Sequence, residues 1–169
     1  EMSPEDLIVN RPKAYRQFMD LYNFMAANSL VYVLPSQQGL QDQVYVANLG
    51  ITLPHLKDRN VVLLSNFTSP PRVGEEKVGE QFFKMMGYET YISPNKWEGN
   101  ADIKYLGDNI YVGGYGIRSD IKTYEWMEKN FDMNIIKVEM VEEYLYHLDC
   151  SIFPVTTEKV MVCTELFEP

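Results

Sequence analysis

The stretch ADIKYLGDNIYVGGYGIRSDIKTYEWMEKNFDMNIIKV, residues 101–138, decides the fold of this chain. It opens with two short apolar segments, Ala101–Leu106 and Asn109–Gly113, and we expect both to be strands. Gly107-Asp108, between them, is a dipeptide typical of tight turns. The sequence therefore predicts a hairpin at the start of this stretch.

A helix and a third strand complete the stretch. Ser119 or Asp120 can cap the helix with a side-chain oxygen. Apolar residues then recur on one side at helical spacing: Tyr124, Met127 and Phe131. Asn134–Val138 follows as the returning strand. The repeating unit is therefore strand, strand, helix, strand.

A similar unit appears upstream, in residues 44–93, with one more apolar segment before its helix. Three short apolar segments are expected to be strands: Val44–Asn48, Gly50–Leu53 and Val61–Leu64. A helix is expected over residues 74–86, with Glu75 and Glu76 in its first turn, where the positive end of the helix dipole stabilises acidic side chains. Glu89–Ile92 then returns as a strand.

Partial copies flank these two units. In residues 1–35, a helix over residues 10–29 and a strand at Leu30–Leu34 look like the second half of an earlier copy. In residues 148–169, a hairpin looks like the first half of a later copy, and its expected strands are Leu148–Pro154 and Val160–Cys163. A period of roughly 45–55 residues is typical of repeat architectures. We expect an α/β segment of a longer protein; the alternative is a complete α+β domain with an irregular repeat.

Composition excludes several classes of function. The chain has 169 residues, of which 46% are hydrophobic, and a formal net charge of −9. The basic footprint of proteins that bind nucleic acid or anionic membranes is absent. Residues 1–10 lack the basic start and apolar core of a signal peptide, and no apolar run approaches the ~20 residues of a membrane span. Two cysteines cannot form a disulfide framework, so we expect a reducing, cytoplasmic location.

Polar groups recur at matching points of the repeat, within residues 42–48, 97–102 and 147–149. If the copies are arranged around an axis, these groups converge on one central site, with Asp102 and Asp149 on opposite sides of a cavity. Two buried carboxylates that face each other need a cation between them. A planar guanidinium fits best, because it can donate paired hydrogen bonds to each carboxylate.

A metal ion is the competing cation. His147 and Asp149 lie two residues apart in an expected strand, so they would share a face and could ligate a metal. The other histidine, His55, lies in an expected loop, so a zinc site has little support and we expect no cofactor. Cys150 and Cys163 are expected opposite each other on the other face, as packing residues.

Each polar residue also has an ordinary structural explanation. Asp102 is typical of a turn or a helix cap, and Glu98 of a solvated loop. Asn48 could satisfy backbone groups at a strand end, and His147 could be a structural histidine. Arg118 could simply cover the following helix. The functional hypothesis therefore depends on the recurrence of these residues together.

Five motifs occur in a fixed order: GLQDQVYVAN (39–48), RVGEE (72–76), WEGNAD (97–102), GYGIRSD (114–120) and YHLD (146–149). Together they resemble the amidinotransferase and dimethylarginine dimethylaminohydrolase-like proteins, which include arginine deiminases and arginine dihydrolases. The resemblance covers nearly the whole chain. It implies the pentein fold, a five-bladed α/β propeller of ββαβ units, which would be incomplete in this chain.

The resemblance also implies roles for the polar residues. Asp102 and Asp149 would hold the guanidinium of a small substrate such as arginine, and His147 would be the general acid and base. Asp42 and Asn48 would line the site, and Glu98 would shape the loop that carries Asp102. Arg118 would bind the α-carboxylate of the substrate.

In this family a cysteine thiolate attacks the guanidino carbon, and the thioether is hydrolysed or passed to an acceptor amine. That nucleophile would lie beyond Pro169, because Cys163 comes too early, so we expect the segment alone to be inactive. The resemblance leaves deiminase, dihydrolase, dimethylarginine hydrolase and amidinotransferase open. The alternative is a module or subunit that binds a guanidino compound or an amino acid without turnover. Incomplete repeat units would expose strand edges, which is compatible with a homo-oligomer.

Overall fold

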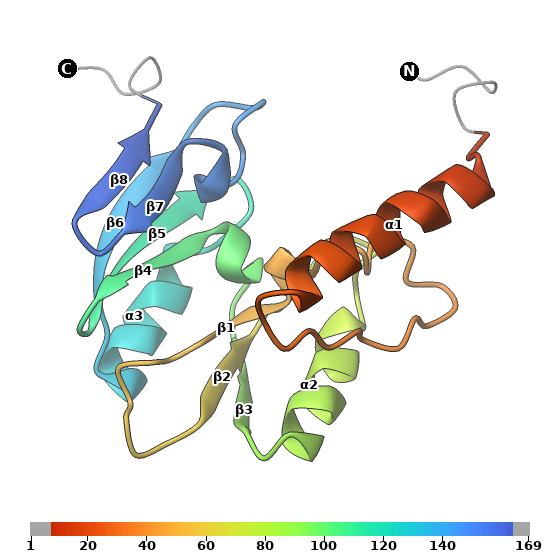
Figure 1. Ribbon diagram of the computed structural model, residues 1–169. Coiled ribbons are helices and arrows are strands. Elements are labelled where there is room, and N and C mark those ends of the chain that lie inside the picture. The colour runs from red at the N-terminus through yellow and green to blue at the C-terminus, as the bar shows by residue number, and fades with distance from the viewer. Residues whose placement is uncertain (1–7, 164–169) are drawn as a thin grey trace. The chain divides into compact units, whose positions relative to one another are not determined.

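Short strands and amphipathic helices alternate in the computed structural model, which describes residues 8–163 (Figure 1). The chain divides into two units, Glu1–Leu34 and Pro35–Pro169. The second unit contains the strands and every site residue that the sequence suggested. Each unit is described by itself.

The first unit contains helix α1, Arg11–Ala26. The Asn10 side chain caps it by accepting a hydrogen bond from the backbone N–H of Lys13 at 3.1 Å, so the expected helix is confirmed. The expected strand Leu30–Leu34 is wrong, because the structure assigns no strand to it. A short extended segment gains little unless its backbone groups pair with a neighbouring strand.

The first sheet of the second unit has the order β1-β2-β3. β1 (Gly50–Thr52) runs antiparallel to β2 (Val61–Leu64), which runs parallel to β3 (Glu89–Ile92). Helix α2 (Glu75–Met85) makes the crossover between the two parallel strands. A parallel pair requires such a crossover, so the helix is a consequence of the strand order.

The second sheet repeats this arrangement. β4 (Ile103–Gly107) runs antiparallel to β5 (Ile110–Gly116), and β5 runs parallel to β6 (Asn134–Met140). Helix α3 (Ile121–Phe131) makes the crossover, and its cap is Asp120, whose side chain accepts a hydrogen bond from Lys122 N. Both sheets therefore follow the strand, strand, helix, strand order expected from the sequence.

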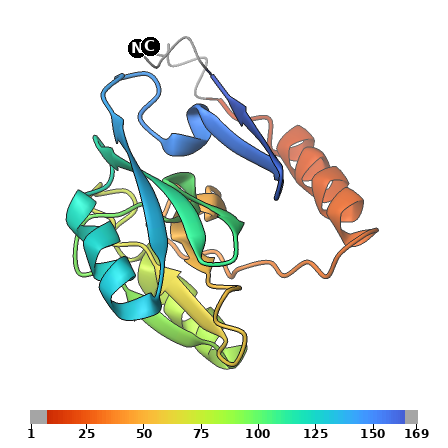
Figure 2. The same cartoon turned by 90° about the vertical axis from the view of Figure 1, so that its left-hand side faces the viewer.

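A hairpin of β7 (Ile152–Thr156) and β8 (Lys159–Val162) forms a third, two-stranded sheet. It lies on the opposite face of the β4-β5-β6 sheet from α3 (Figure 2). The register pairs Ile152 with Val162, so Cys163 lies opposite Ser151 rather than opposite Cys150. Both cysteines are exposed, so their expected role in packing is wrong.

Three short 3-10 turns replace expected strand ends. They are η1 (Val46–Leu49), η2 (Gly99–Ala101) and η3 (Leu148–Cys150). The strand expected at Val44–Asn48 is therefore wrong, and Asp149 lies in a turn rather than in a strand. In η1, the Asn48 N–H donates a local hydrogen bond to the Tyr45 carbonyl, and the Ser65 hydroxyl, from further along the chain, donates to the Asn48 carbonyl.

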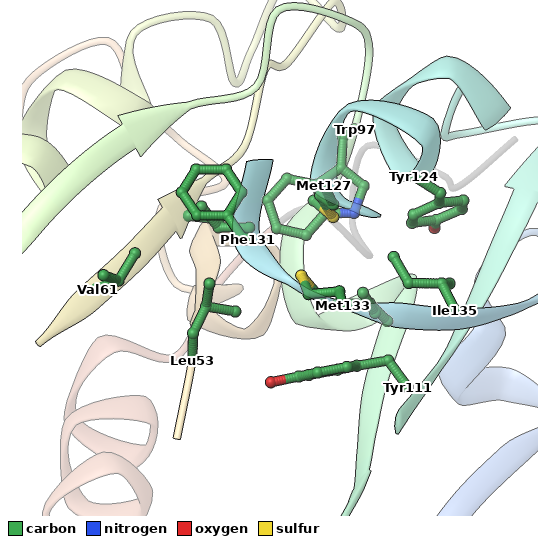
Figure 3. Packing of buried hydrophobic residues seen from close by; sticks show 11 residues of the cluster. Leu53, Val61, Trp97, Tyr111, Tyr124, Met127, Phe131, Met133 and Ile135 are labelled. Atoms are coloured by element: carbon green, nitrogen blue, oxygen red, sulfur yellow. The ribbon is translucent and has the colours of Figure 1, made fainter. Parts of the chain in front are cut away.

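The main core is an aromatic and aliphatic cluster between the two sheets and α3 (Figure 3). Fully buried residues of the two hydrophobic clusters stand directly beside polar site residues in the sequence. Trp97 precedes Glu98, Ile103 follows Asp102, and Leu148 follows His147; Trp97, Ile103 and Leu148 have no exposed surface. Each polar residue is thus attached to the core by its immediate neighbour.

Candidate functional site

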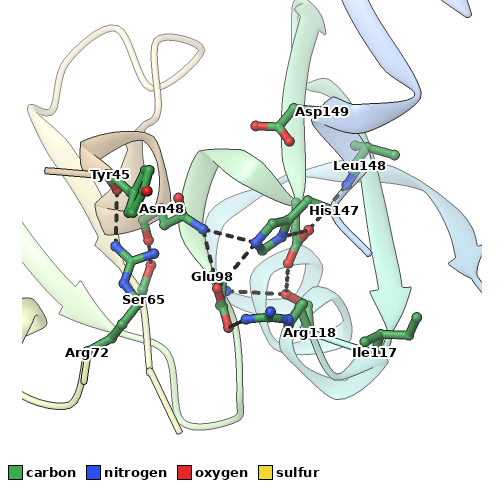
Figure 4. A network of polar contacts seen from close by, with 12 residues as sticks. Tyr45, Asn48, Ser65, Arg72, Glu98, Ile117, Arg118, His147, Leu148 and Asp149 are labelled. Atoms are coloured by element: carbon green, nitrogen blue, oxygen red, sulfur yellow. Dashed lines mark hydrogen bonds and ion pairs between the residues drawn. The ribbon is translucent and has the colours of Figure 1, made fainter. Parts of the chain in front are cut away.

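His147 lies at the centre of a buried polar network (Figure 4). Its Nδ1 lies 2.8 Å from Asp102 Oδ1. Its Nε2 lies 3.2 Å from Asn48 Nδ2 and 3.4 Å from Glu98 Oε2. Asn48 belongs to η1, Glu98 and Asp102 flank η2, and His147 precedes η3. The three turns therefore bring together four of the residues that the sequence suggested.

Asp102 is fully engaged with donors of the protein. Its Oδ1 also accepts the Leu148 backbone N–H at 3.3 Å, and its Oδ2 accepts the Ser119 hydroxyl at 2.5 Å. The hydroxyl of Tyr124 donates to the main-chain carbonyl of Asp102 at 2.8 Å. The side chain of Asp102 is only 1% exposed. This carboxylate is therefore placed to orient the His147 ring.

Glu98 is buried and connects His147 to Arg118. Its Oε2 accepts a hydrogen bond from Asn48 Nδ2 at 3.3 Å, and its Oε1 pairs with Arg118 Nη1 at 3.3 Å. The guanidinium of Arg118 also stacks on the Tyr146 ring, 4.4 Å from its centroid, which is a favourable cation–π contact. Glu98 is thus a buried carboxylate, and the alternative expectation of a solvated loop residue is wrong.

The partners of His147 suit two protonation states. In the neutral ring, Nδ1–H donates to Asp102, and Nε2 accepts a hydrogen bond from the Asn48 amide. In the charged ring, Nε2–H can donate to Glu98 Oε2, while Asn48 keeps its hydrogen bond to the same oxygen. The ring can therefore gain and lose a proton at Nε2 without moving, as a general acid or base must.

His55 offers an internal contrast, because its partners require the opposite neutral form. Its Nε2 lies 2.8 Å from the Phe131 carbonyl oxygen, and its Nδ1 lies 2.8 Å from the Tyr111 hydroxyl. A carbonyl oxygen only accepts, so Nε2 carries the proton and Nδ1 accepts from the tyrosine. Burial raises the pKa of Tyr111, which keeps its hydroxyl protonated as a donor.

We expect the two histidines of the chain to adopt opposite neutral tautomers, His147 with its proton on Nδ1 and His55 with its proton on Nε2. Long-range ¹H–¹⁵N correlation spectra distinguish the two forms, and a His55→Gln variant assigns the signals. A neutral His147 with its proton on Nε2 would contradict the network described here.

Asp149 lies apart from these contacts, at a more open position (Figure 4). Its side chain is 35% exposed, and Oδ2 lies 3.9 Å from Nζ of Lys104. Lys104 also donates a hydrogen bond to the Asn100 carbonyl. Burial lowers the pKa of Lys104, against the opposing effect of Asp149 and Asp102. A lysine that the sequence had not suggested therefore lies beside the second predicted carboxylate.

Ser119 and Arg72 also contribute contacts that the sequence did not suggest. Ser119 accepts a hydrogen bond from the Glu98 N–H at 3.2 Å and so connects Glu98 to Asp102. The sequence signal for Ser119 was its position next to Asp120, the residue that caps α3. Arg72 forms two hydrogen bonds to Glu75 and donates to the Tyr45 carbonyl at 3.1 Å, which steadies the turn that carries Asn48.

Asp42, like Asp149, stands outside this network. Asp42 is half-buried in the turn that precedes η1, and the network found within residues 8–163 does not include it. In that same range, no group of three or more His, Cys, Asp or Glu side chains is arranged to hold a metal ion. None of the helices described is both long enough and apolar enough to span a lipid bilayer.

Comparison with other sequences finds relatives among arginine-modifying enzymes, although no family model matches the chain. The bifunctional arginine dihydrolase/ornithine cyclodeaminase AgrE of Nostoc sp. is 29% identical over 148 residues, which are 86% of this chain and 20% of that protein. The uncharacterised protein YkgA of Bacillus subtilis is 30% identical over 144 residues, 84% of this chain and 48% of that protein.

Comparison with solved structures identifies the fold. The N-terminal domain of the arginine dihydrolase ArgZ, bound to its product, matches with a TM-score of 0.84 and 25% identity, over 94% of this chain and 57% of that chain. A dimethylarginine dimethylaminohydrolase matches with a TM-score of 0.72 at 16% identity, over 89% of this chain and 60% of that chain. This chain has the pentein fold. The resemblance carried by the five motifs is confirmed, and so is the α/β ββαβ fold class.

The pentein chain spans only part of each relative, at most about half of the two curated proteins named above. The relationship therefore establishes the fold and the homology to arginine dihydrolase domains. The activity and substrates of the whole protein are matters for proposal.

Proposed function

We propose that this pentein chain forms the guanidinium-binding and proton-transferring side of an active site. The site would hydrolyse or transfer the amidino group of arginine or of an arginine derivative. The observation that supports this function most is His147 between Asp102 and Glu98, with Asn48 beside the same ring nitrogen as Glu98. The similarity to an arginine dihydrolase domain over 94% of the chain supports the substrate class.

In this proposal the two aspartates have different roles. Asp149 receives the guanidinium of the ligand, because its carboxylate is still partly open. Asp102 acts through His147, because its oxygens are already engaged with donors of the protein. Arg118, whose side chain is 34% exposed, is available to the α-carboxylate of the ligand.

The reaction follows the chemistry of the family. A cysteine thiolate forms a bond to the guanidino carbon, and the C–N bond to the leaving amine breaks as His147 Nε2–H gives that amine its proton. Water then attacks the thioether carbon, His147 takes the proton from the water, and the C–S bond breaks. Asp102 and Glu98 stabilise the charged ring, which is present before the first step and forms again when His147 takes the proton from water.

A second function has an observation in its favour. Cys150 and Cys163 are both exposed, and neither belongs to the network around His147. A chain that binds a guanidino ligand without turnover would need no nucleophile. L-Arginine is therefore incubated with this chain and with the full product of its gene, and citrulline, ornithine and ammonia are assayed. Product from the full gene product supports the enzyme, and binding without product from either supports the module.

We expect L-arginine to bind the chain at least about tenfold more tightly than L-citrulline, whose neutral ureido group has nearly the same shape. The carboxylates attract the charge that only arginine carries. Asp149→Asn should weaken arginine binding by about tenfold or more, because it removes a charge-assisted hydrogen bond. Calorimetric titration measures both effects.

The matched control for this experiment is Asp132→Asn. It makes the same change of charge at an exposed position with φ 52°, a conformation that asparagine tolerates well. We expect arginine affinity to be unchanged in this variant. Equal affinity for arginine and citrulline, or no arginine binding, would refute the proposed function.

A further inference from the structure

Lys104 is the one cation found close to Asp149 within the described chain, and its position is unusual for a lysine. Its side chain is only 13% exposed, although β4 is a short strand next to a hairpin turn. The neighbouring residue Ile103 points into the main core, so alternation along the strand turns Lys104 toward the face covered by η3 and β7. A lysine in this position cannot extend freely into water.

The partners of Lys104 are the two turns that carry the site. Its Nζ donates to the carbonyl of Asn100, in η2, and lies 3.9 Å from Asp149 Oδ2, in η3. The charged groups that act on it are Asp149 and Asp102. Its cross-strand partner on β5 is Val112, and β7 carries no ionisable side chain. The ammonium therefore faces the carboxylate to which the proposed function assigns the guanidinium of the ligand.

We propose that Lys104 competes with the ligand for Asp149 and thereby sets the affinity of the site for guanidinium compounds. This inference rests on the proposed function. A bound guanidinium and the Lys104 ammonium would be two like charges sharing one carboxylate, which costs free energy at close range. Binding then requires either repulsion between the two cations or loss of the proton from Lys104.

This competition has a pH dependence whose sign follows from the site. Burial lowers the pKa of Lys104, so its ammonium loses its proton at a lower pH than an ordinary lysine would. The competing charge then disappears, and the affinity of the wild-type chain for a guanidinium should rise with pH. Methylguanidinium is the probe, because it has no amine or carboxylate of its own and stays charged throughout this range.

Two variants of opposite sign test the inference. Lys104→Met keeps the length of the side chain but removes its charge, and we expect it to bind methylguanidinium at least about threefold more tightly than the wild type at pH 7. The affinity of this variant should not change with pH, and the affinity of the wild type should rise toward it as Lys104 loses its proton. Lys104→Arg places a guanidinium in the same position and should bind the probe more weakly than the wild type.

A purely structural role for Lys104 predicts another pattern. If the lysine only ties η2 to η3, Lys104→Met should bind the probe as tightly as or more weakly than the wild type at every pH, and that result would overturn the inference. Failure of the wild type and of every variant to bind methylguanidinium or L-arginine would remove the proposed function, and this inference with it.

A measurement without ligand distinguishes a failure of this inference from a failure of the proposed function. The ¹³Cε signal of Lys104 reports its titration directly, and Asp149→Asn should move that titration to lower pH, because Asp149 favours the charged ammonium. An unchanged Lys104 titration in Asp149→Asn would show that the two side chains do not interact, and would overturn the competition even if arginine binds.

Discussion

Replacing Gly99 by alanine is expected to cost about 3–5 kcal/mol of the free energy of unfolding and to disperse the polar network. Gly99 begins η2, between Glu98 and Asp102, and has a φ of +62°. A Cβ there would meet the backbone carbonyl of Asn48, 2.5 Å from its carbon, and would lie 2.6 Å from Gly50 N. Backbone atoms of a turn and a strand cannot move aside as a flexible side chain can.

Gly87→Ala is the matched control for this experiment. Gly87 also has a positive φ, +81°, but a Cβ there would meet nothing within 4 Å. It therefore carries the conformational strain without the clash, and we expect a loss of only about 1–2 kcal/mol. Urea denaturation followed by circular dichroism measures both variants. Similar losses in the two would show that η1 and η2 do not pack as closely as described.

The second large effect is expected from Asp102→Asn. Asp102 accepts hydrogen bonds from the His147 ring, the Ser119 hydroxyl and the Leu148 backbone N–H. An asparagine has only one acceptor oxygen, so its amide N–H₂ turns toward one of these groups. If it donates to Nδ1, the His147 proton moves to Nε2, the nitrogen that accepts a proton in the proposed reaction.

We expect this change to lower kcat/KM of the full gene product by about 100-fold or more, since general acid and base catalysis contributes on that scale. The same change should appear in this chain without any substrate, as a shift of the His147 proton from Nδ1 to Nε2 in ¹H–¹⁵N correlation spectra. Asp132→Asn, with the same change of charge far from the site, should alter neither quantity. Full activity in Asp102→Asn would exclude the orienting role of Asp102.

Much of the fold could be predicted, because most elements have clear local signals. β3 has the predicted bounds, Glu89–Ile92, since the end of a helix precedes it and a turn follows. Val44–Asn48 was mistaken for a strand because an apolar run does not reveal a 3-10 turn. That turn depends on a hydrogen bond from Ser65, seventeen residues further along the chain. Leu30–Leu34 was mistaken for a strand because apolar composition cannot show whether a pairing partner is present.

The site was predictable in membership but less so in geometry. The motifs indicated that Asn48, Glu98, Asp102 and His147 belong together, and the structure brings these four into one network. How far each carboxylate is buried depends on three short turns and the core behind them, which spacing along the chain does not encode. Lys104 was overlooked because a lysine in an alternating strand normally indicates a solvated face.

Three of the polar site residues are adjacent in sequence to a fully buried residue, and this limits which substitutions can accumulate during evolution. In each of Trp97-Glu98, Asp102-Ile103 and His147-Leu148, one residue belongs to the polar network of the proposed site and the other is fully buried in the core. A substitution that loosens the apolar partner also misaligns the reactive one. Selection for folding and selection for chemistry therefore fall on the same three dipeptides, and neither demand can be relaxed independently of the other.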